Sequence, residues 1–115
     1  MIDAIVTSKT PVYTYNHGYV MSMAFAIFIA GHKRFGGKYS TYMYHELSSM
    51  AVGKAEEIKR ASVEYDRLQK MYDTFITERT SLPQRKLNSV KKEASDWFFG
   101  LEDALKYEIV TDVIE

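Results

Sequence analysis

The sequence predicts an α/β fold with a largely parallel sheet. Short segments rich in β-branched and aromatic residues alternate along the chain with segments of helical periodicity. One helical segment is much longer than the others. Because only three short strands are expected, the sheet would be thin, which indicates that part of the fold lies outside this chain.

The first strand and the first helix are expected before residue 32. Residues 12–15 are β-branched and aromatic and follow Pro11, which is tolerated at the start of a strand. Residues 22–30 are apolar on nearly every face, which predicts a buried helix. Gly31 then predicts a glycine C-cap at the end of this helix.

A second strand is expected at residues 39–44, which contain Tyr, Thr and Met. His45 would stand at the carboxyl end of this strand. Four basic residues before it flank a pair of glycines and are expected in an exposed loop: His32, Lys33, Arg34 and Lys38.

The longest predicted element is an amphipathic helix over residues 54–79. Its apolar residues recur at spacings of three and four: Ile58, Ala61, Tyr65, Leu68, Tyr72 and Phe75. At 1.5 Å per residue it would be on the order of 35–40 Å long, which is long for so small a chain. We expect it to project past its own core and to bury one stripe of side chains against a partner.

The remaining segment predicts two short helices and a last strand. Ser81 and Pro83 are typical of a helix start, and this helix should end before Asp96. A further helix is expected at residues 101–107, and the strand at residues 109–114.

Composition limits the classes of function. The 115 residues carry a formal net charge of +0 and are 46% hydrophobic, which predicts one soluble globular unit and argues against a nucleic-acid partner. The chain has no cysteine, and its three histidines lack metal-ligand spacing, so neither a disulfide nor a metal site is expected. The apolar residues 20–30 cover about half of a membrane span, and no secretory signal is visible. We therefore expect a cytoplasmic protein without a membrane partner.

Ser22 has two possible roles from its position alone. It stands where a strand-to-helix junction is predicted, so unsatisfied backbone amides could face the oxyanion that develops on a substrate carbonyl when the serine hydroxyl attacks it. His45 could reach it as a base if the two strands are neighbours. The alternative is that Ser22 is an ordinary N-cap and that His45 is a surface residue. No G-x-S-x-G motif is present to decide between them.

Three motifs in order resemble the proteolytic subunit of the Clp protease, a cytoplasmic serine peptidase with a crotonase-like fold. "GYVMSMAFAIFIAGHKR" is similar to the family's nucleophile segment. "YMYHELSSMAVGKAEEI" is similar to its strand ending in Met-x-His, followed by a glycine-containing loop and a long helix. "SDWFFGLEDALKYEIVTDVI" is similar to its carboxyl-terminal Asp-containing segment. The resemblance covers residues 1–115 as the carboxyl-terminal portion of one ClpP-like peptidase domain.

The resemblance implies a catalytic triad of Ser22 as nucleophile, His45 as base and Asp96 as orienting acid. It also implies that the amide of Met23 is one oxyanion-hole donor. The helix that begins at Lys54 resembles the family's handle, through which two rings meet face to face, so a ring-like homo-oligomer is expected.

The sequence departs from the family in two ways. Glu108 stands where the family has a tight glycine after a helix. The first half of the family's domain, which supplies the second oxyanion donor, has no counterpart in this chain. We therefore expect an incomplete crotonase/ClpP-like fold that a complementary chain completes, as in a split enzyme of phage type. The alternative is a truncated sequence.

The function implied is a serine endopeptidase component that hydrolyses unfolded polypeptides. ATP would be used by an AAA+ unfoldase partner, and this chain would bind no cofactor because it has no P-loop. The alternative is a catalytically inactive ClpP-like assembly or regulatory subunit.

Overall fold

A computed structural model of the chain describes residues 1–47 and 52–115. Residues 48–51, within the loop expected before the long helix, lie outside the described residues. In chain order the elements are α1 (Ile2–Val6), β1 (Tyr13–Asn16), β2 (Tyr19–Met21), α2 (Met23–Ile29), β3 (Lys33–Gly36), β4 (Thr41–Tyr44), α3 (Ala55–Arg79), α4 (Gln84–Lys92), β5 (Trp97–Gly100), α5 (Leu101–Lys106) and β6 (Asp112–Val113).

The described strands form two three-stranded sheets rather than the one thin sheet expected. In the first sheet the order is β1-β3-β6, and both pairings are parallel. In the second the order is β2-β4-β5, with β2 parallel and β5 antiparallel to β4. The mixed α/β class and the largely parallel pairing are as predicted, but the antiparallel edge strand β5 was not.

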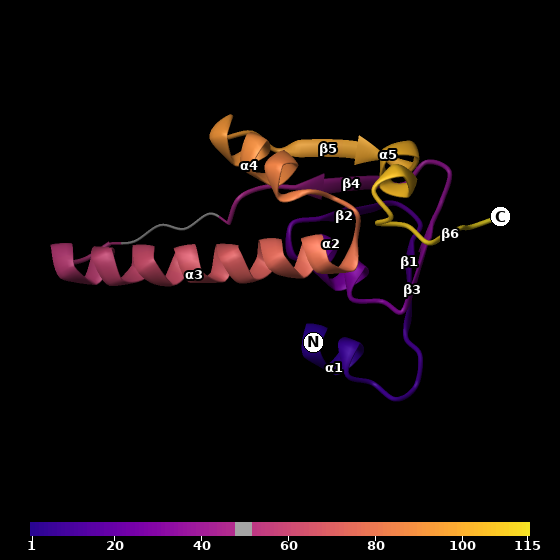
Figure 1. The fold of residues 1–115 in the computed structure, drawn as a ribbon, viewed down its shortest axis with the longest axis horizontal. Helices are drawn as coiled ribbons and strands as arrows, with labels where there is room; N and C mark the ends of the chain where they lie inside the picture. The colour runs from indigo at the N-terminus through magenta and orange to yellow at the C-terminus, as the bar shows by residue number, and fades with distance from the viewer. Residues whose placement is uncertain (48–51) are drawn as a thin grey trace.

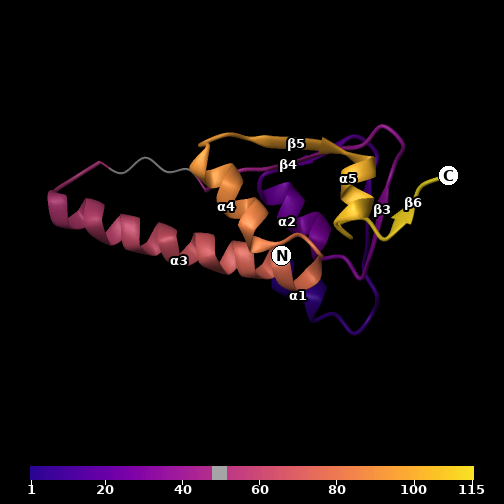
Figure 2. The same ribbon diagram turned by 45° about the horizontal axis from the view of Figure 1, so that its top comes forward.

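The core lies between the second sheet and α3, with α2 in the middle (Figures 1 and 2). Phe25 and Ile29 of α2 are fully buried, as are Tyr42 and Tyr44 of β4. Full burial of each large apolar side chain contributes about 1.5–3 kcal/mol of transfer free energy, so this layer accounts for much of the stability. The apolar segment before Gly31 is thus a buried helix, as its sequence predicts.

The prediction that Gly31 is the C-cap of this helix is wrong. The C-cap residue of α2 is Ala30, with φ −67°, and Gly31 does not have a positive φ. A Cβ at Gly31 would lie 2.4 Å from Oγ1 of Thr14 and 2.9 Å from the carbonyl oxygen of Lys33. The glycine is therefore required by the close approach of β1 and β3, not by a left-handed turn.

The long helix α3 projects beyond the rest of the molecule, as predicted (Figure 1). Its fully buried residues, Asp73 and Ile76, lie near its carboxyl end, whereas Ile58 and Val63 near its start are exposed. The radius of gyration is 15.4 Å, against about 13 Å for a compact domain of this length. No helix among the described residues is long and apolar enough to cross a bilayer.

The prediction that Lys33 and Arg34 lie in an exposed loop is also wrong, because these residues begin β3. The Arg34 side chain is 7% exposed and donates hydrogen bonds to five backbone carbonyl groups: those of Ile29, Gly31, Arg79, Glu108 and Ile109. Burial, and then the charge of the neighbouring Arg79, lower the pKa of Arg34. A guanidinium has five N–H donors, so it can satisfy carbonyl groups from several segments at once. The carboxyl end of α2 carries partial negative charge, which favours a cation there.

Two helices end in the same hydrogen-bonded turn without a glycine. After α4, the amides of Ala94 and Ser95 donate to the carbonyls of Lys91 and Val90, and Ala94 has φ 50°. After α5, Glu108 has φ 58° in the equivalent turn. This is the Schellman arrangement, which normally places glycine at the left-handed position. Glu108, which stands where the family that the sequence resembles has a glycine, thus adopts a left-handed conformation.

Ala94→Gly is expected to raise the free energy of unfolding by about 0.5–1 kcal/mol, because glycine adopts the left-handed conformation without the steric cost of a Cβ. Chemical denaturation measures the change. Ala61→Gly is the control. It lies inside α3, where glycine disfavours the helix, so it should lower the free energy of unfolding by about 1 kcal/mol. A decrease for both variants would mean that the turn at residue 94 is not strained.

Candidate catalytic site

Ser22 lies at the sharp junction where β2 ends and α2 begins. Its backbone has φ 57° and ψ −121°, a conformation that costs a residue with a side chain of order 1–3 kcal/mol. Its amide donates to the carbonyl of Met43 at 3.3 Å, and its own carbonyl accepts from the amide of Phe25 at 3.1 Å. Strained residues that are held by their surroundings in this way are concentrated at functional sites.

The Ser22 hydroxyl group does not cap the helix. The position is the N-cap of α2, but no hydrogen bond from the side chain to the helix amides is formed. Instead Oγ lies 3.0 Å from Nε2 of His45, at the end of β4. Parallel pairing of β2 with β4 brings the two residues together, since Met21 pairs with Met43.

The surroundings of the His45 ring assign its tautomer. Nδ1 forms a short contact with the backbone carbonyl oxygen of Glu46, which can only accept a hydrogen bond. We therefore assign the proton to Nδ1, so that Nε2 carries a free lone pair. Nε2 then accepts the hydrogen bond from the Ser22 hydroxyl, which is the arrangement a general base needs.

Asp96 precedes β5 and is exposed. Tyr44 pairs with Trp97 in the antiparallel register of β4 and β5, so one further step along both strands would set His45 opposite Asp96. The hydrogen bonds of the described residues include none between Asp96 and His45. The structure thus joins Ser22 to His45, and it brings the strand that carries Asp96 alongside the strand that carries His45.

Met23 is the first residue of α2, directly after Ser22. Its side chain is 53% exposed. Its amide is among the first four of the helix, which have no partner one turn earlier. The positive end of the helix is therefore beside the Ser22 hydroxyl, although α2 is short and this field is modest.

Sequence reasoning missed three residues of α3 that border this site. The Tyr72 hydroxyl donates to the Ser22 carbonyl at 3.2 Å, and Gln69 accepts a hydrogen bond from the amide of Leu47 at 2.7 Å. Asp73 lies beside them and is 2% exposed. The periodicity identified Tyr72 only as an apolar position, and a Gln or Asp on an amphipathic helix is usually solvated, so the sequence offered no signal for these contacts.

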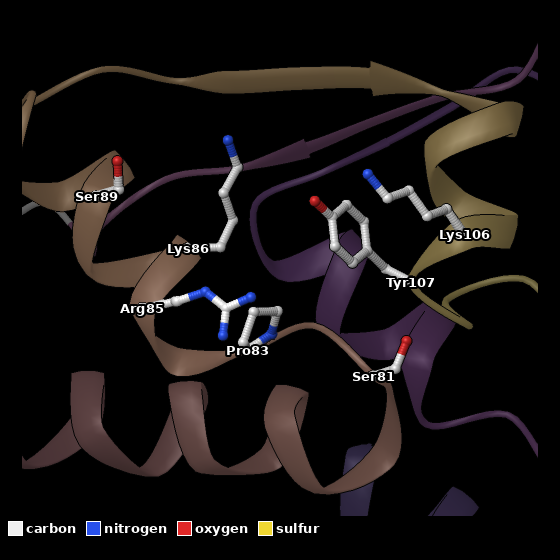
Figure 3. Close-up of a pocket in the computed structure, with 7 residues that line it drawn as sticks. All are labelled: Ser81, Pro83, Arg85, Lys86, Ser89, Lys106 and Tyr107. Carbon is white, nitrogen blue, oxygen red and sulfur yellow. The ribbon is translucent and has the colours of Figure 1, made fainter.

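Two surface cavities lie beside α4. One, of about 630 Å³, is lined by the residues drawn in Figure 3: Ser81, Pro83, Arg85, Lys86, Ser89, Lys106 and Tyr107. It is basic and contains none of the three predicted catalytic residues. The other, of about 710 Å³, lies between α3 and α4 and includes Glu46, next to His45.

The comparisons with known proteins agree on one family. The family model described as Clp protease matches residues 1–115. ATP-dependent Clp protease proteolytic subunit 2 of Treponema pallidum is 29% identical over 118 residues, with 100% of this chain and 58% of the relative covered. Proteolytic subunit 1 of Chlamydia felis is 30% identical, with 97% of this chain and 55% of the relative covered. The proteolytic subunit of Deinococcus radiodurans is 32% identical, with 98% and 55% covered.

The chain therefore spans a little over half the length of the curated relatives it matches. The match of the family model extends over every residue, and the strand-to-helix serine and the histidine that faces it lie within the matched region. The chain belongs to the Clp protease family.

Proposed function

We propose that this chain supplies the triad of a serine endopeptidase, with Ser22 as nucleophile, His45 as general base and Asp96 as orienting acid. The observation that carries the proposal is the 3.0 Å contact between Ser22 Oγ and Nε2 of His45. The hydroxyl is held at a strained junction and is not used as a helix cap. An ordinary N-cap serine would bond to the helix amides instead.

In this mechanism Ser22 Oγ attacks the carbonyl carbon of a peptide bond while its proton moves to Nε2 of His45. The amide of Met23 donates to the oxyanion that forms. His45 then gives the proton to the leaving amine, and an acyl ester remains on Ser22. Water, deprotonated by Nε2, cleaves the ester and restores the serine. Asp96 stabilises the charged imidazole in both halves of the reaction.

The substrates we propose are unfolded polypeptides, delivered by an AAA+ unfoldase that uses the ATP, so that this chain itself needs no cofactor. The names of the relatives support this assignment, because they describe the proteolytic subunit of an ATP-dependent protease. We propose a ring-like homo-oligomer in the cytoplasm, assembled partly through the projecting half of α3. The exposed apolar residues of that half, which include Ile58 and Val63, support the assembly role.

We further propose that a complementary chain, carrying the first half of the domain, completes the site. The relatives are almost twice as long as the region matched. Only one oxyanion donor, the Met23 amide, stands next to Ser22 in the sequence. A second donor from the complementary chain would complete the oxyanion hole, and removal of one such donor costs about 10²–10³-fold in turnover.

A catalytically inactive assembly or regulatory subunit is the second candidate. One observation favours it: His45 Nδ1 contacts the Glu46 carbonyl, whereas Asp96 is exposed. In such a subunit Ser22 and His45 would still be in contact, but no peptide would be hydrolysed.

Labelling with a fluorophosphonate separates these proposals. The affinity-tagged protein is purified from its source cells with its bound partners and is also produced alone. We expect Ser22 to be labelled in the native assembly and not in the isolated chain, with Ser22→Ala as the control for the site of labelling. Equal labelling of both samples would refute the need for a complementary chain. Absence of labelling in both would refute the peptidase and favour the inactive subunit.

A further inference from the structure

A buried carboxylate between α3 and α4, that of Asp73, forms hydrogen bonds with four side chains. Both oxygens of Asp73 are used, and the residue is 2% exposed. Its partners are the hydroxyl of Tyr44 at 2.6 Å, the amide nitrogens of Gln69 at 2.9 Å and Gln84 at 3.1 Å, and the ammonium of Lys91.

Stability alone is a weak reason for this cluster. Removing a carboxylate and an ammonium from water costs several kcal/mol per ion, and apolar residues of similar volume often replace buried ion pairs without loss. A fully bonded polar cluster does fix the geometry of the segments that it joins. Asp73 joins α3 to α4 through Gln84 and Lys91, and to β4 through Tyr44.

The cluster holds the chain on both sides of His45. Tyr44 directly precedes His45, and side chains alternate along a strand, so Tyr44 points into the core while His45 faces Ser22. After His45, the amide of Leu47 donates to the side-chain oxygen of Gln69 at 2.7 Å. The amide nitrogen of the same Gln69 donates to Asp73. Residues 44 and 47 are therefore both connected to one carboxylate.

The same turn of α3 also contacts the nucleophile. Tyr72, next to Asp73, donates to the Ser22 carbonyl at 3.2 Å, and its ring stacks on that of Tyr44 at 5.8 Å between centroids. Burial, followed by the Asp73 charge, raises the pKa of both tyrosines above their ordinary value. A tyrosine hydroxyl is protonated at neutral pH even at its ordinary pKa of about 10, so both groups are donors there.

We propose that Asp73 is a positioning residue for His45, acting through Tyr44 on one side and through Gln69 and Leu47 on the other. The inference rests on the proposed function, in which His45 is the base. Its consequence is that the position of α3 determines the distance between His45 and Ser22, so the helix that would carry assembly contacts also sets the geometry of the site.

The chain offers a matched pair of variants as a test. Tyr44→Phe removes the hydroxyl bonded to Asp73. Tyr42→Phe, the control, removes a second fully buried hydroxyl from the same strand, one that is bonded to Ser40 at 2.9 Å and not to α3. Asp73→Asn is the stronger variant, because its amide would place a donor against the donors of Gln84 or Lys91.

Two kinds of measurement are needed. In the native assembly, kcat and KM for a peptide report on catalysis. In the same assembly, hydrogen exchange of the Leu47 amide and NMR of the His45 ring nitrogens report on position. We expect Tyr44→Phe to lower kcat about tenfold with KM within about twofold, as for an interaction that acts in the transition state, whereas Tyr42→Phe leaves kcat unchanged. Leu47 exchange should accelerate at least about tenfold in Asp73→Asn.

Equal losses of kcat in Tyr44→Phe and Tyr42→Phe would overturn the proposal, because a general loss of packing would then explain both. Unchanged Leu47 exchange in Asp73→Asn would also overturn it. If Asp73→Asn does not fold, the comparison of Tyr44→Phe with Tyr42→Phe decides. If the wild type has no turnover, the proposed function fails, while the His45 ring signals and the Leu47 exchange still decide the positioning role.

Discussion

Ser22→Ala is expected to lower the turnover of a peptide substrate by at least about 10³-fold in the native assembly, because no other group in the proposed mechanism can form the acyl ester. KM should change little, since the hydroxyl acts mainly in the transition state. The oligomer should remain intact. Peptide hydrolysis under saturating substrate measures the loss, and size-exclusion chromatography with light scattering checks the assembly.

Ser22→Gly is the companion variant. It removes the same nucleophile and also the Cβ that is strained at φ 57°. We therefore expect it to be inactive too, yet more stable to denaturant than Ser22→Ala by about 1 kcal/mol. Retained turnover in both variants would show that Ser22 is not the nucleophile. Equal stability of the two would show that the junction is not strained.

Asp96→Asn should lower kcat by about 10³–10⁴-fold. An orienting carboxylate stabilises the imidazolium that forms when His45 takes the serine proton, and an amide of the same shape cannot do so. This variant separates the role of the Asp96 carboxylate from that of the Glu46 carbonyl, which contacts Nδ1 of His45. A carbonyl can hold the tautomer but contributes less stabilisation to the cation.

Glu93→Gln serves as the control for Asp96→Asn. Glu93 is the C-cap residue of α4, three positions before Asp96, and it is also exposed. It should leave kcat within about twofold of the wild type. A fall of less than about threefold in Asp96→Asn would mean that the Glu46 carbonyl alone orients His45, and the triad would then be a Ser-His pair.

Local pattern was enough to predict several elements. The spacing of Ile58, Leu68 and Phe75 predicted the long helix within one residue at its start, because helical periodicity repeats over seven turns. The apolar segment after Ser22 predicted α2 for a similar reason. The candidates Ser22 and His45 were found from their motifs, and the structure brings them to 3.0 Å from each other.

Elements without a local pattern were not found. The β3 strand is Lys-Arg-Phe-Gly, whose charges resemble a loop until the carbonyl groups that accept from Arg34 are known. Those carbonyls come from segments up to 75 residues away in sequence. β5 was not recognised as a strand because its partner, β4, lies more than 50 positions earlier.

By itself the sequence determined the family motifs and the class of the fold, and it named Ser22, His45 and Asp96 as candidate site residues, since each depends on residue types at fixed spacings. Only the tertiary structure decided that the Ser22 hydroxyl faces His45 rather than the helix amides. It alone also revealed the cluster around Asp73, on either side of His45. The physical reason is that these contacts join segments distant in the chain, so the direction of each hydrogen bond depends on packing that no local pattern encodes.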